Sequence, residues 1–330
     1  MPTFGVHDGG ASAVHRSTLC ERKRSGAGCA TNREGQCCVR EPLEQVFEGA
    51  KALYRRVRAR LLSLDLAPSA PFVLGNEERE ASARMSVIVA VHDAPEDTLR
   101  CLRSLERFGG RAEIIIVDDG SRLAVTKRLL EGVCLSRGWP LITNGKAMGH
   151  SRASESGVSI STRPYVCLLN SDAIVTSRSW LGIARAFAES PEVAVVGPST
   201  SYTPTPQCLW RAQHCRHYWS DEQIWCFAEK NAARHQFEPF MDLPMVGGFA
   251  FFVRRAVWDQ LGGFDTNLPD YGNETEFCQR VTRAGQRIVW AKGSYIHHLG
   301  SASYGRTLGF REIQRRCLEA RDYIQEKGAP

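Results

Sequence analysis

The sequence has no hydrophobic run long enough to cross a membrane. Its longest apolar stretch, residues 243–253, contains a proline and two glycines and is followed by two arginines, whereas a spanning helix needs about 20 apolar residues. The first fifteen residues also lack the basic segment and the apolar core of a secretory signal. We therefore expect a cytoplasmic protein, with peripheral contact to a membrane surface as an alternative.

Two common nucleotide-binding motifs are absent as well. Neither G-x-G-x-x-G after the first predicted strand nor G-x-x-x-x-G-K-[S/T] occurs in the sequence, which argues against a dinucleotide-binding enzyme and a P-loop NTPase. The formal net charge of the chain is only +6; this suits an anionic ligand but does not require nucleic acid. A hydrophobic fraction of 43% and a charged fraction of 24% are typical of a globular protein.

The twelve cysteines include no C-x-x-C pair. In a reducing compartment they are expected to be free thiols, metal ligands or catalytic groups. A zinc cluster in the first forty residues stays open as an alternative, although the spacing there matches no known zinc site. We interpret residues 1–40, which show no apolar periodicity, as a disordered tail that contains Cys20, Cys29, Cys37 and Cys38.

Residues 41–84 are predicted to form an amphipathic helix followed by a linker. In residues 41–66 the apolar side chains recur at three- and four-residue spacing, as on one face of a helix. A cluster of arginines at its end would suit anionic lipid, but we favour a helix docked on the domain by its apolar face. Residues 67–83, with two prolines and an acidic patch, are typical of a linker.

Beyond residue 84, short apolar runs alternate with amphipathic segments. Uninterrupted apolar runs are expected of buried parallel strands. The alternation predicts an α/β fold with a mostly parallel central sheet and helices on both faces. The predicted strands cover residues 86–91, 113–117, 140–143, 165–169 and 287–290, and helices are predicted from residue 93 and over 124–134, 151–161 and 306–330.

Acidic residues follow three of these strands. Asp93 comes after the first, Asp119 after the second and Asp172 after the fourth. In open α/β sheets, ligands bind beyond the carboxyl ends of the strands, so we expect these acids to meet at one ligand site. Each acid alone could equally be a turn former or a helix cap.

These motifs and their order resemble glycosyltransferase family 2, whose members are inverting, nucleotide-sugar-dependent enzymes of the GT-A fold. The resemblance covers residues 85–305. It implies a transferase of hexosyl or deoxyhexosyl type in glycan or polysaccharide biosynthesis. The motifs that carry it are Val89-Ala-Val-His-Asp93, Ile115-Ile-Val-Asp-Asp-Gly-Ser121, Leu168-Leu-Asn-Ser-Asp172, Gly262-Gly-Phe-Asp265, Asn273-Glu-Thr-Glu276 and His298-x4-Ser303.

The resemblance also implies roles for individual residues and a divalent cation, Mg²⁺ or Mn²⁺, as cofactor. Glu274 falls at the general base, and His298, with His297 as runner-up, falls at a histidine that reaches the metal or the diphosphate. The metal ligands implied are Asp172 and His298. The residues implied to bind the nucleotide-sugar are Asp93, Asp119, Asn170, Asp172, Gly247 and Gly248.

Three positions depart from the family pattern. Asn170 replaces the first acid of the D-x-D motif, Asn273 replaces an acid before the base, and Glu155 stands where the family often has asparagine. These departures leave open a non-catalytic nucleotide-sugar-binding protein of the same fold. A sugar nucleotidyltransferase is a weaker alternative, because its Gly-rich basic loop is absent after the first strand.

The expected partners are a nucleotide-sugar donor and a glycan, lipid-linked or protein acceptor, without nucleic acid. Residues 203–242 concentrate aromatic side chains, which either stack on an acceptor sugar or form a satellite hydrophobic cluster. Residues 41–66 would provide the peripheral membrane contact.

Overall fold

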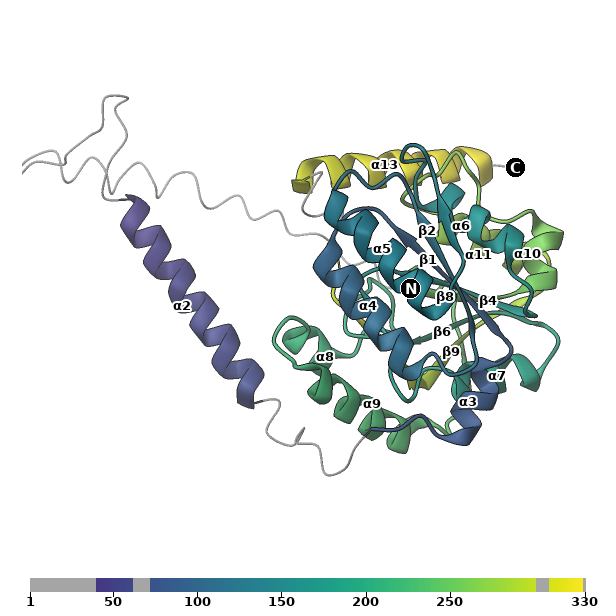
Figure 1. Cartoon of the computed structure of the whole chain (residues 1–330), viewed down its shortest axis with the longest axis horizontal. Coiled ribbons are helices and arrows are strands. Elements are labelled where there is room, and N and C mark those ends of the chain that lie inside the picture. The colour runs from purple at the N-terminus through teal and green to yellow at the C-terminus, as the bar shows by residue number, and fades with distance from the viewer. Residues whose placement is uncertain (1–39, 62–71, 301–308, 329–330) are drawn as a thin grey trace, which may run out of the picture. The chain divides into compact units, whose positions relative to one another are not determined.

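The computed structural model describes residues 40–61, 72–300 and 309–328 of the chain (Figure 1). The chain forms two compact units, residues 1–58 and residues 59–330. The predicted tail, residues 1–40, lies outside the described residues except for Arg40, and so does Ser303 of the last motif. None of the described helices has the length and apolar character needed to cross a membrane.

The described part of the first unit is helical. Helix α2 (Arg40–Leu61) confirms the helix predicted over residues 41–66, although it ends five residues earlier. Leu53, Tyr54 and Val57 on this helix are each at least half exposed. The predicted docking of its apolar face on the domain stays a prediction.

The linker predicted over residues 67–83 is wrong for its last part. Residues 76–82 form helix α3 (Asn76–Ser82), and Glu78 on it is buried. The Glu78 carboxylate accepts hydrogen bonds from the backbone N–H groups of Trp180 and Leu181, at 2.8 and 2.9 Å. These N–H groups lie at the N-terminus of α7 (Leu181–Glu189), where a carboxylate is favourable. This tertiary contact holds α3 on the domain, and the sequence of α3 alone does not indicate it.

The second unit is built on a mixed eight-stranded sheet. Its order is β3-β2-β1-β4-β8-β6-β9-β7. β1 is parallel to β2 and β4, β2 to β3 and β6 to β9, whereas β8 is antiparallel to both of its neighbours and β7 is antiparallel to β9. The strands are β1 (Met85–Val91), β2 (Glu113–Asp118), β3 (Leu141–Thr143), β4 (Tyr165–Asn170), β6 (Val193–Ser199), β7 (Met241–Asp242), β8 (Ala250–Arg254) and β9 (Arg287–Tyr295).

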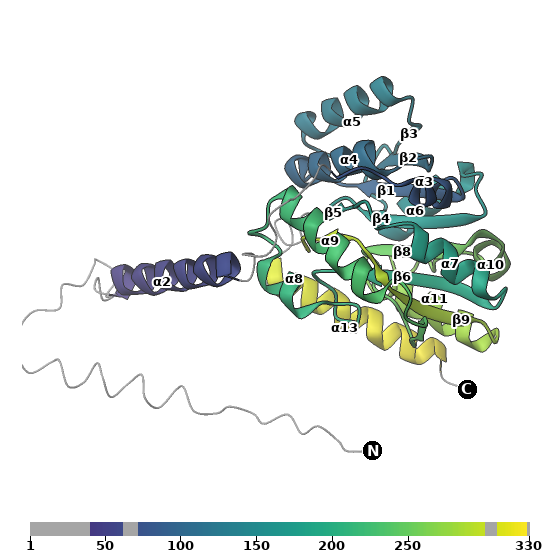
Figure 2. The same ribbon diagram turned by 90° about the horizontal axis from the view of Figure 1, so that it is seen from below.

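Both faces of the sheet are covered by helices, as predicted. Successive strand residues point to opposite faces. Val87 of β1 accordingly packs in one core cluster with Leu102, whereas Ile88 packs in another with Phe277. Helices α4 and α5 lie side by side (Figures 1 and 2). The helices are α4 (Pro95–Phe108), α5 (Ala124–Arg137), α6 (His150–Ile160), α7 (Leu181–Glu189), α8 (Trp210–Cys215), α9 (Asp221–His235), α10 (Arg255–Leu261), α11 (Asn273–Arg283) and α13 (Gly309–Gly328).

The aromatic stretch of residues 203–242 divides into two groups. Trp219 and Phe227 are buried in a cluster around α8 and α9, with Trp225 packed against it. Trp210 and Tyr218 are 57% and 40% exposed. The satellite cluster therefore accounts for Trp219, Trp225 and Phe227, whereas Trp210, Tyr218 and Phe237 are exposed. Stacking of aromatic side chains on an acceptor sugar stays a prediction.

Among the described residues, eight cysteines are free thiols and most are buried. Burial raises the pKa of Cys278 to about 12. None of the eight stands at a predicted catalytic position. One of them, Cys317 on α13, is exposed.

Candidate active site

A cavity of about 740 Å³ opens beyond the carboxyl ends of β1, β2 and β4. This volume lies within the range of ligand pockets, about 300–1,000 Å³. The structure brings nearly all of the predicted site residues to it, and Asp93 is the exception. The predicted residues that line it are Asp119, Asn170, Asp172, Gly247, Gly248, Glu274 and His298.

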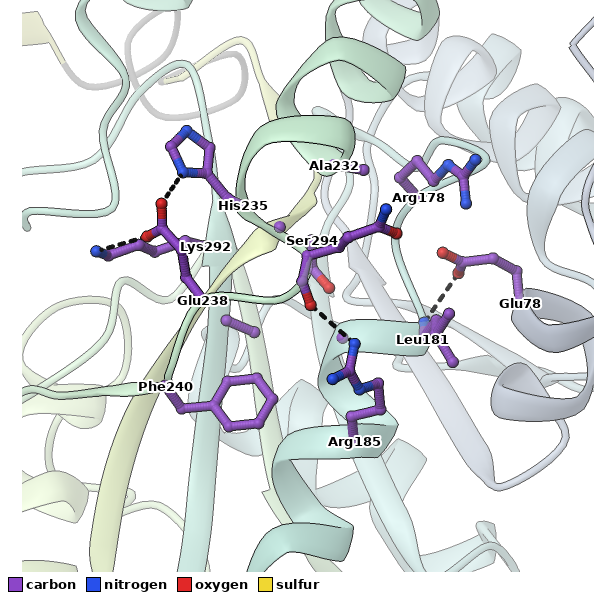
Figure 3. A pocket seen from close by; sticks show the side chains of 14 residues that line it. Glu78, Arg178, Leu181, Arg185, Ala232, His235, Glu238, Phe240, Lys292 and Ser294 are labelled. Carbon is purple, nitrogen blue, oxygen red and sulfur yellow. Dashed lines mark hydrogen bonds and ion pairs between the residues drawn. The ribbon is translucent and has the colours of Figure 1, made fainter.

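A second cavity, of about 20 Å³, lies on another part of the domain (Figure 3). It is large enough for about one water molecule. Its charged side chains already have partners: His235 and Lys292 both bind Glu238, and Arg185 donates to the backbone oxygen of Gln236. With a volume of about 20 Å³, this cavity is too small for a nucleotide-sugar.

Asp172 and His298 are brought together by a small second sheet. Asp172 precedes β5 (Ala173–Ile174), which pairs with β10 (His297–His298) so that His298 stands opposite Ala173. The His298 Nε2 atom lies 3.2 Å from Asp172 Oδ1, and Nδ1 lies 2.7 Å from the carbonyl oxygen of Tyr202. Nδ1 therefore donates to Tyr202, which aims Nε2 at Asp172. Burial alone would lower the pKa of His298, but the Asp172 carboxylate outweighs burial and raises it.

His297 points away from the cavity. Its Nε2 lies 3.0 Å from the carbonyl oxygen of Arg216, and its Nδ1 lies 2.9 Å from the hydroxyl of Tyr295. Burial lowers the pKa of His297 to about 3, so the ring is neutral. Because neighbouring residues of a strand face opposite ways, His298 lines the cavity and His297 does not.

The donor atoms of Asp172 and His298 fit a divalent cation that binds together with a phosphorylated ligand. A carboxylate oxygen and an imidazole nitrogen are both accepted by Mn²⁺. Within the described residues, no group of three or more His, Cys, Asp or Glu side chains is arranged to hold a metal ion. A cation here would therefore take further ligands from phosphate and water, as is usual for Mg²⁺ sites at phosphorylated substrates.

Glu274 lies in the first turn of α11, against the backbone of Gly248. A side chain on Gly248 would overlap with the Glu274 carboxylate. Burial raises the pKa of Glu274 to about 7, opposed only by a hydrogen bond from its own backbone N–H. A carboxylate with such a pKa is suited to accept a proton near neutral pH.

Glu276, two residues further on, serves the fold. It is 3% exposed, and its carboxylate accepts from Arg280 and from Lys327. Asn273, at the start of the same helix, is fully buried and donates to the hydroxyl of Ser151 at 3.1 Å. Asn170, in contrast, lines the cavity, where its Nδ2 lies 3.4 Å from His298 Nε2. The two asparagines that depart from the family pattern thus have different surroundings.

The two acids predicted to contact the nucleoside are placed differently. Asp119 lines the cavity and accepts from the backbone N–H groups of Met148 and Gly149, both at 2.9 Å. Asp93 does not line the cavity; its carboxylate accepts from the N–H groups of Arg122 and Leu123 at the start of α5. Its position therefore gives no support to the predicted contact with the nucleotide, which stays a prediction.

Glu155 has a structural explanation that the sequence does not show. Its carboxylate accepts from the backbone N–H of Phe264 at 3.0 Å, against Gly263, where no side chain would fit. Gly263 has a φ of +68°, a conformation that favours glycine. Glu155 therefore holds the Gly262-Gly-Phe-Asp265 turn and does not line the cavity.

Sequence reasoning missed the contribution of α13 to the cavity. The helix itself was predicted, but nothing in the sequence placed it beside Glu274. The three- and four-residue spacing of the cavity-lining positions was the only available signal. From α13 the cavity is lined by Ile313, Cys317, Ala320, Arg321, Ile324 and Gln325.

A sequence profile and the fold agree on the relatives of this chain. The profile described as Glycosyl transferase family 2 matches residues 86–262, more than half of the chain. No curated protein sequence matches the chain.

Among solved structures, the chain is similar to the mannosyltransferase PcManGT from Pyrobaculum calidifontis in complex with GDP-Man and Mn²⁺. That match has a TM-score of 0.51 at 16% identity and covers 88% of this chain and 75% of the other. It is also similar to GalNAc-T7 with UDP, GalNAc and Mn²⁺, with a TM-score of 0.51 at 15% identity, covering 65% of this chain and 43% of the other. The chain thus spans less than half of the GalNAc-T7 chain. At these identities the likeness concerns the fold, and the predicted GT-A α/β fold is confirmed.

Proposed function

Because the chain belongs to glycosyl transferase family 2, we propose that it transfers a hexosyl or deoxyhexosyl group from a nucleoside diphosphate to an acceptor hydroxyl, with inversion at the anomeric carbon. One observation carries the proposal. The Glu274 carboxyl, with a pKa raised to about 7, lines the same cavity as the Asp172–His298 pair.

Glu274 is proposed as the general base. Its carboxylate takes the proton of the acceptor hydroxyl while that oxygen attacks the anomeric carbon and the bond to the diphosphate breaks. A single carboxylate is enough for direct displacement, which inverts the configuration without a covalent intermediate. A positioned base contributes about two to four orders of magnitude in rate.

The donor is proposed to lie between Asp119 and Asp172. Asp119 holds the loop of residues 144–149 at the edge of the cavity, where the nucleoside would bind. Gly247 and Gly248 line the same cavity, and the Gly247 backbone fits closely against Thr203; the donor sugar is proposed to lie beside them. The two similar solved structures contain GDP-Man and UDP, which makes both nucleotides candidates here.

Asp172 and His298 are proposed to hold a divalent cation. Such a cation supplies positive charge that stabilises the departing diphosphate. Both similar solved structures contain Mn²⁺, which favours Mn²⁺ over Mg²⁺ as the first ion to try. Asn170 contributes a neutral amide beside His298, which can hydrogen-bond the sugar or phosphate.

A second candidate function is binding of the nucleotide-sugar without transfer. Asn170 and Asn273 favour it, because an amide replaces an acid at both positions. The raised pKa of Glu274 favours transfer, since a binding site does not need a base near pH 7. The nucleotidyltransferase alternative gains no support from the cavity.

Peripheral membrane contact through residues 41–66 is a separate proposal. The exposed Leu53, Tyr54 and Val57 of α2 are accompanied by Lys51, Arg55, Arg56, Arg58 and Arg60, without an acidic residue between 49 and 61. Apolar and basic side chains on one helix favour the surface of anionic lipid. Flotation of the full chain with anionic and with neutral vesicles tests this, and absence from the anionic vesicle fraction would contradict it.

A thermal-shift screen tests the donor site. A ligand that binds only the folded state raises its stability. UDP, GDP and their sugar conjugates are compared with and without Mn²⁺, and we expect at least one to raise the melting temperature, more with Mn²⁺. No shift across the whole panel would count against both the transferase and the binding protein.

A further inference from the structure

Lys327, near the end of α13, joins three segments of the domain. Its Nζ donates to Asp265 Oδ2 at 2.8 Å and to Glu276 Oε1 at 3.0 Å. Asp265 also accepts from the hydroxyl of Tyr323, at 2.8 Å. Burial opposes ionisation of Asp265, but the hydrogen bonds from Lys327, Asn267 and Tyr323 lower its pKa to about 2. The contacts of Lys327 are therefore charge-assisted at neutral pH.

Glu276 fixes how α11 is turned about its axis. Two residues along an α-helix correspond to a rotation of about 200°, so Glu276 points away from the cavity that Glu274 lines. Its buried carboxylate accepts a hydrogen bond from the Arg280 guanidinium, which also donates to the backbone oxygens of Leu261 and Gly263. Lys327 adds α13 to this set of contacts.

A close apolar contact lies one turn away, where α11 begins. A Cβ on Gly272 would lie 2.9 Å from Ile324 Cδ1 and 3.0 Å from Ala320 Cβ. Gly272 has a φ of +81° and directly precedes Asn273. Helix α13 therefore rests on the segment from which Glu274 projects, by apolar packing at Gly272 and by the ammonium of Lys327 at Glu276.

We infer that Lys327 is a positioning residue for the transfer: it holds α13 against the first turn of α11 and thereby keeps the Glu274 carboxylate at the cavity wall. The inference rests on the proposed function, because it takes Glu274 as the base. Lys327 does not line the cavity, so it acts through its contacts with Glu276 and Asp265.

The side-chain exposures separate this role from a general effect on stability. The Lys327 side chain is 44% exposed, whereas those of Glu276 and Asp265 are 4% and 10% exposed. Without Lys327, Glu276 keeps its bonds from Arg280, and Asp265 keeps those from Asn267 and Tyr323, so neither buried carboxylate is left without a donor. A misplacement of the base by about 1 Å can lower the rate about 100-fold. We therefore expect the loss of Lys327 to lower kcat more than it lowers the free energy of unfolding.

The test compares three variants of the full chain. Lys327→Ala removes the contacts of the ammonium group with Asp265 and Glu276, which we call the clamp. Lys327→Arg keeps a positive charge on a side chain of similar length. Arg315→Ala is the matched control, because Arg315 lies on α13 and its ion pairs with described residues go only to Glu312 and Glu319 of the same helix. The readouts are kcat and donor KM for release of nucleoside diphosphate, and amide hydrogen exchange in α11, including the Glu276 N–H that donates to the Gly272 oxygen.

We expect Lys327→Ala to lower kcat about 10- to 100-fold, with donor KM unchanged and faster exchange in the first turn of α11. Lys327→Arg should recover most of kcat, and Arg315→Ala should match the wild type. Wild-type kcat and exchange in Lys327→Ala would overturn the inference, as would an equal loss in Arg315→Ala. If the wild type transfers no sugar, the proposed function fails, and unchanged exchange in Lys327→Ala would then overturn the clamp as well.

Discussion

The backbone of Gly248 lies directly against the carboxylate of Glu274, without space for a side chain between them. Gly248→Ala should therefore displace the carboxylate and lower kcat by about tenfold or more. The matched control is Gly132→Ala on α5, where an added methyl group meets nothing within 4 Å; it should leave turnover unchanged. Full turnover in the Gly248 variant would show that the position of Glu274 does not matter.

The pKa of Glu274 predicts how transfer depends on pH. A base acts in its ionised form, and burial raises the pKa of this carboxyl to about 7. We expect kcat/KM to rise as pH increases through about 7 and to level off above it. A pH–rate profile between about pH 5 and pH 9 measures this, and a value that stays constant down to the acid end would contradict the role of Glu274.

Removal of the metal should abolish transfer reversibly. We expect EDTA to stop the wild-type enzyme and Mn²⁺ to restore it, because Asp172 and His298 are donors that suit this ion. Asp172→Ala should not be restored by Mn²⁺. His298→Ala should need more Mn²⁺ than the wild type, whereas His214→Ala, outside the cavity, should not. Full activity in EDTA would exclude the proposed role of the cation.

The contact between Glu78 and α7 predicts a loss of stability. Glu78→Ala leaves the buried N–H groups of Trp180 and Leu181 without the partner they have now, which should lower the free energy of unfolding by about 2 kcal/mol. Glu80→Ala, on the same helix, removes an exposed pair with Arg111 and should cost less than about 1 kcal/mol. Urea unfolding measures both, and equal effects would mean that the buried contact contributes no more than the exposed pair.

The sequence predicts the strands well because buried parallel strands are uninterrupted apolar runs. β1, β2 and β4 are of this kind. Of the acids that follow them, Asp119 and Asp172 line the cavity as expected, whereas Asp93 does not. The choice between His297 and His298 could not be made from the sequence, since both stand in one short strand and only its pairing with β5 decides which ring faces Asp172.

Helix α3 and the position of α13 could not be predicted for a different reason. The sequence of α3 has one apolar residue, Ala81, and its buried residues include Glu78, whose partners are about 100 residues away in the chain. α13 is held on the domain by the packing of Ala320 and Ile324 and by ion pairs to Asp265 and Asp270. Such tertiary contacts leave no periodic signal by which their partners could be recognised.

The measurement that tests the central claim most directly is release of nucleoside diphosphate from nucleotide-sugars in the presence of Mn²⁺ and acceptor. It compares the wild type with Glu274→Gln, and Glu131→Gln on the exposed surface of α5 is the control. Our account predicts release by the wild type and the control, and a loss of about 100-fold or more in Glu274→Gln with donor binding retained. Equal release by Glu274→Gln and the wild type would contradict it.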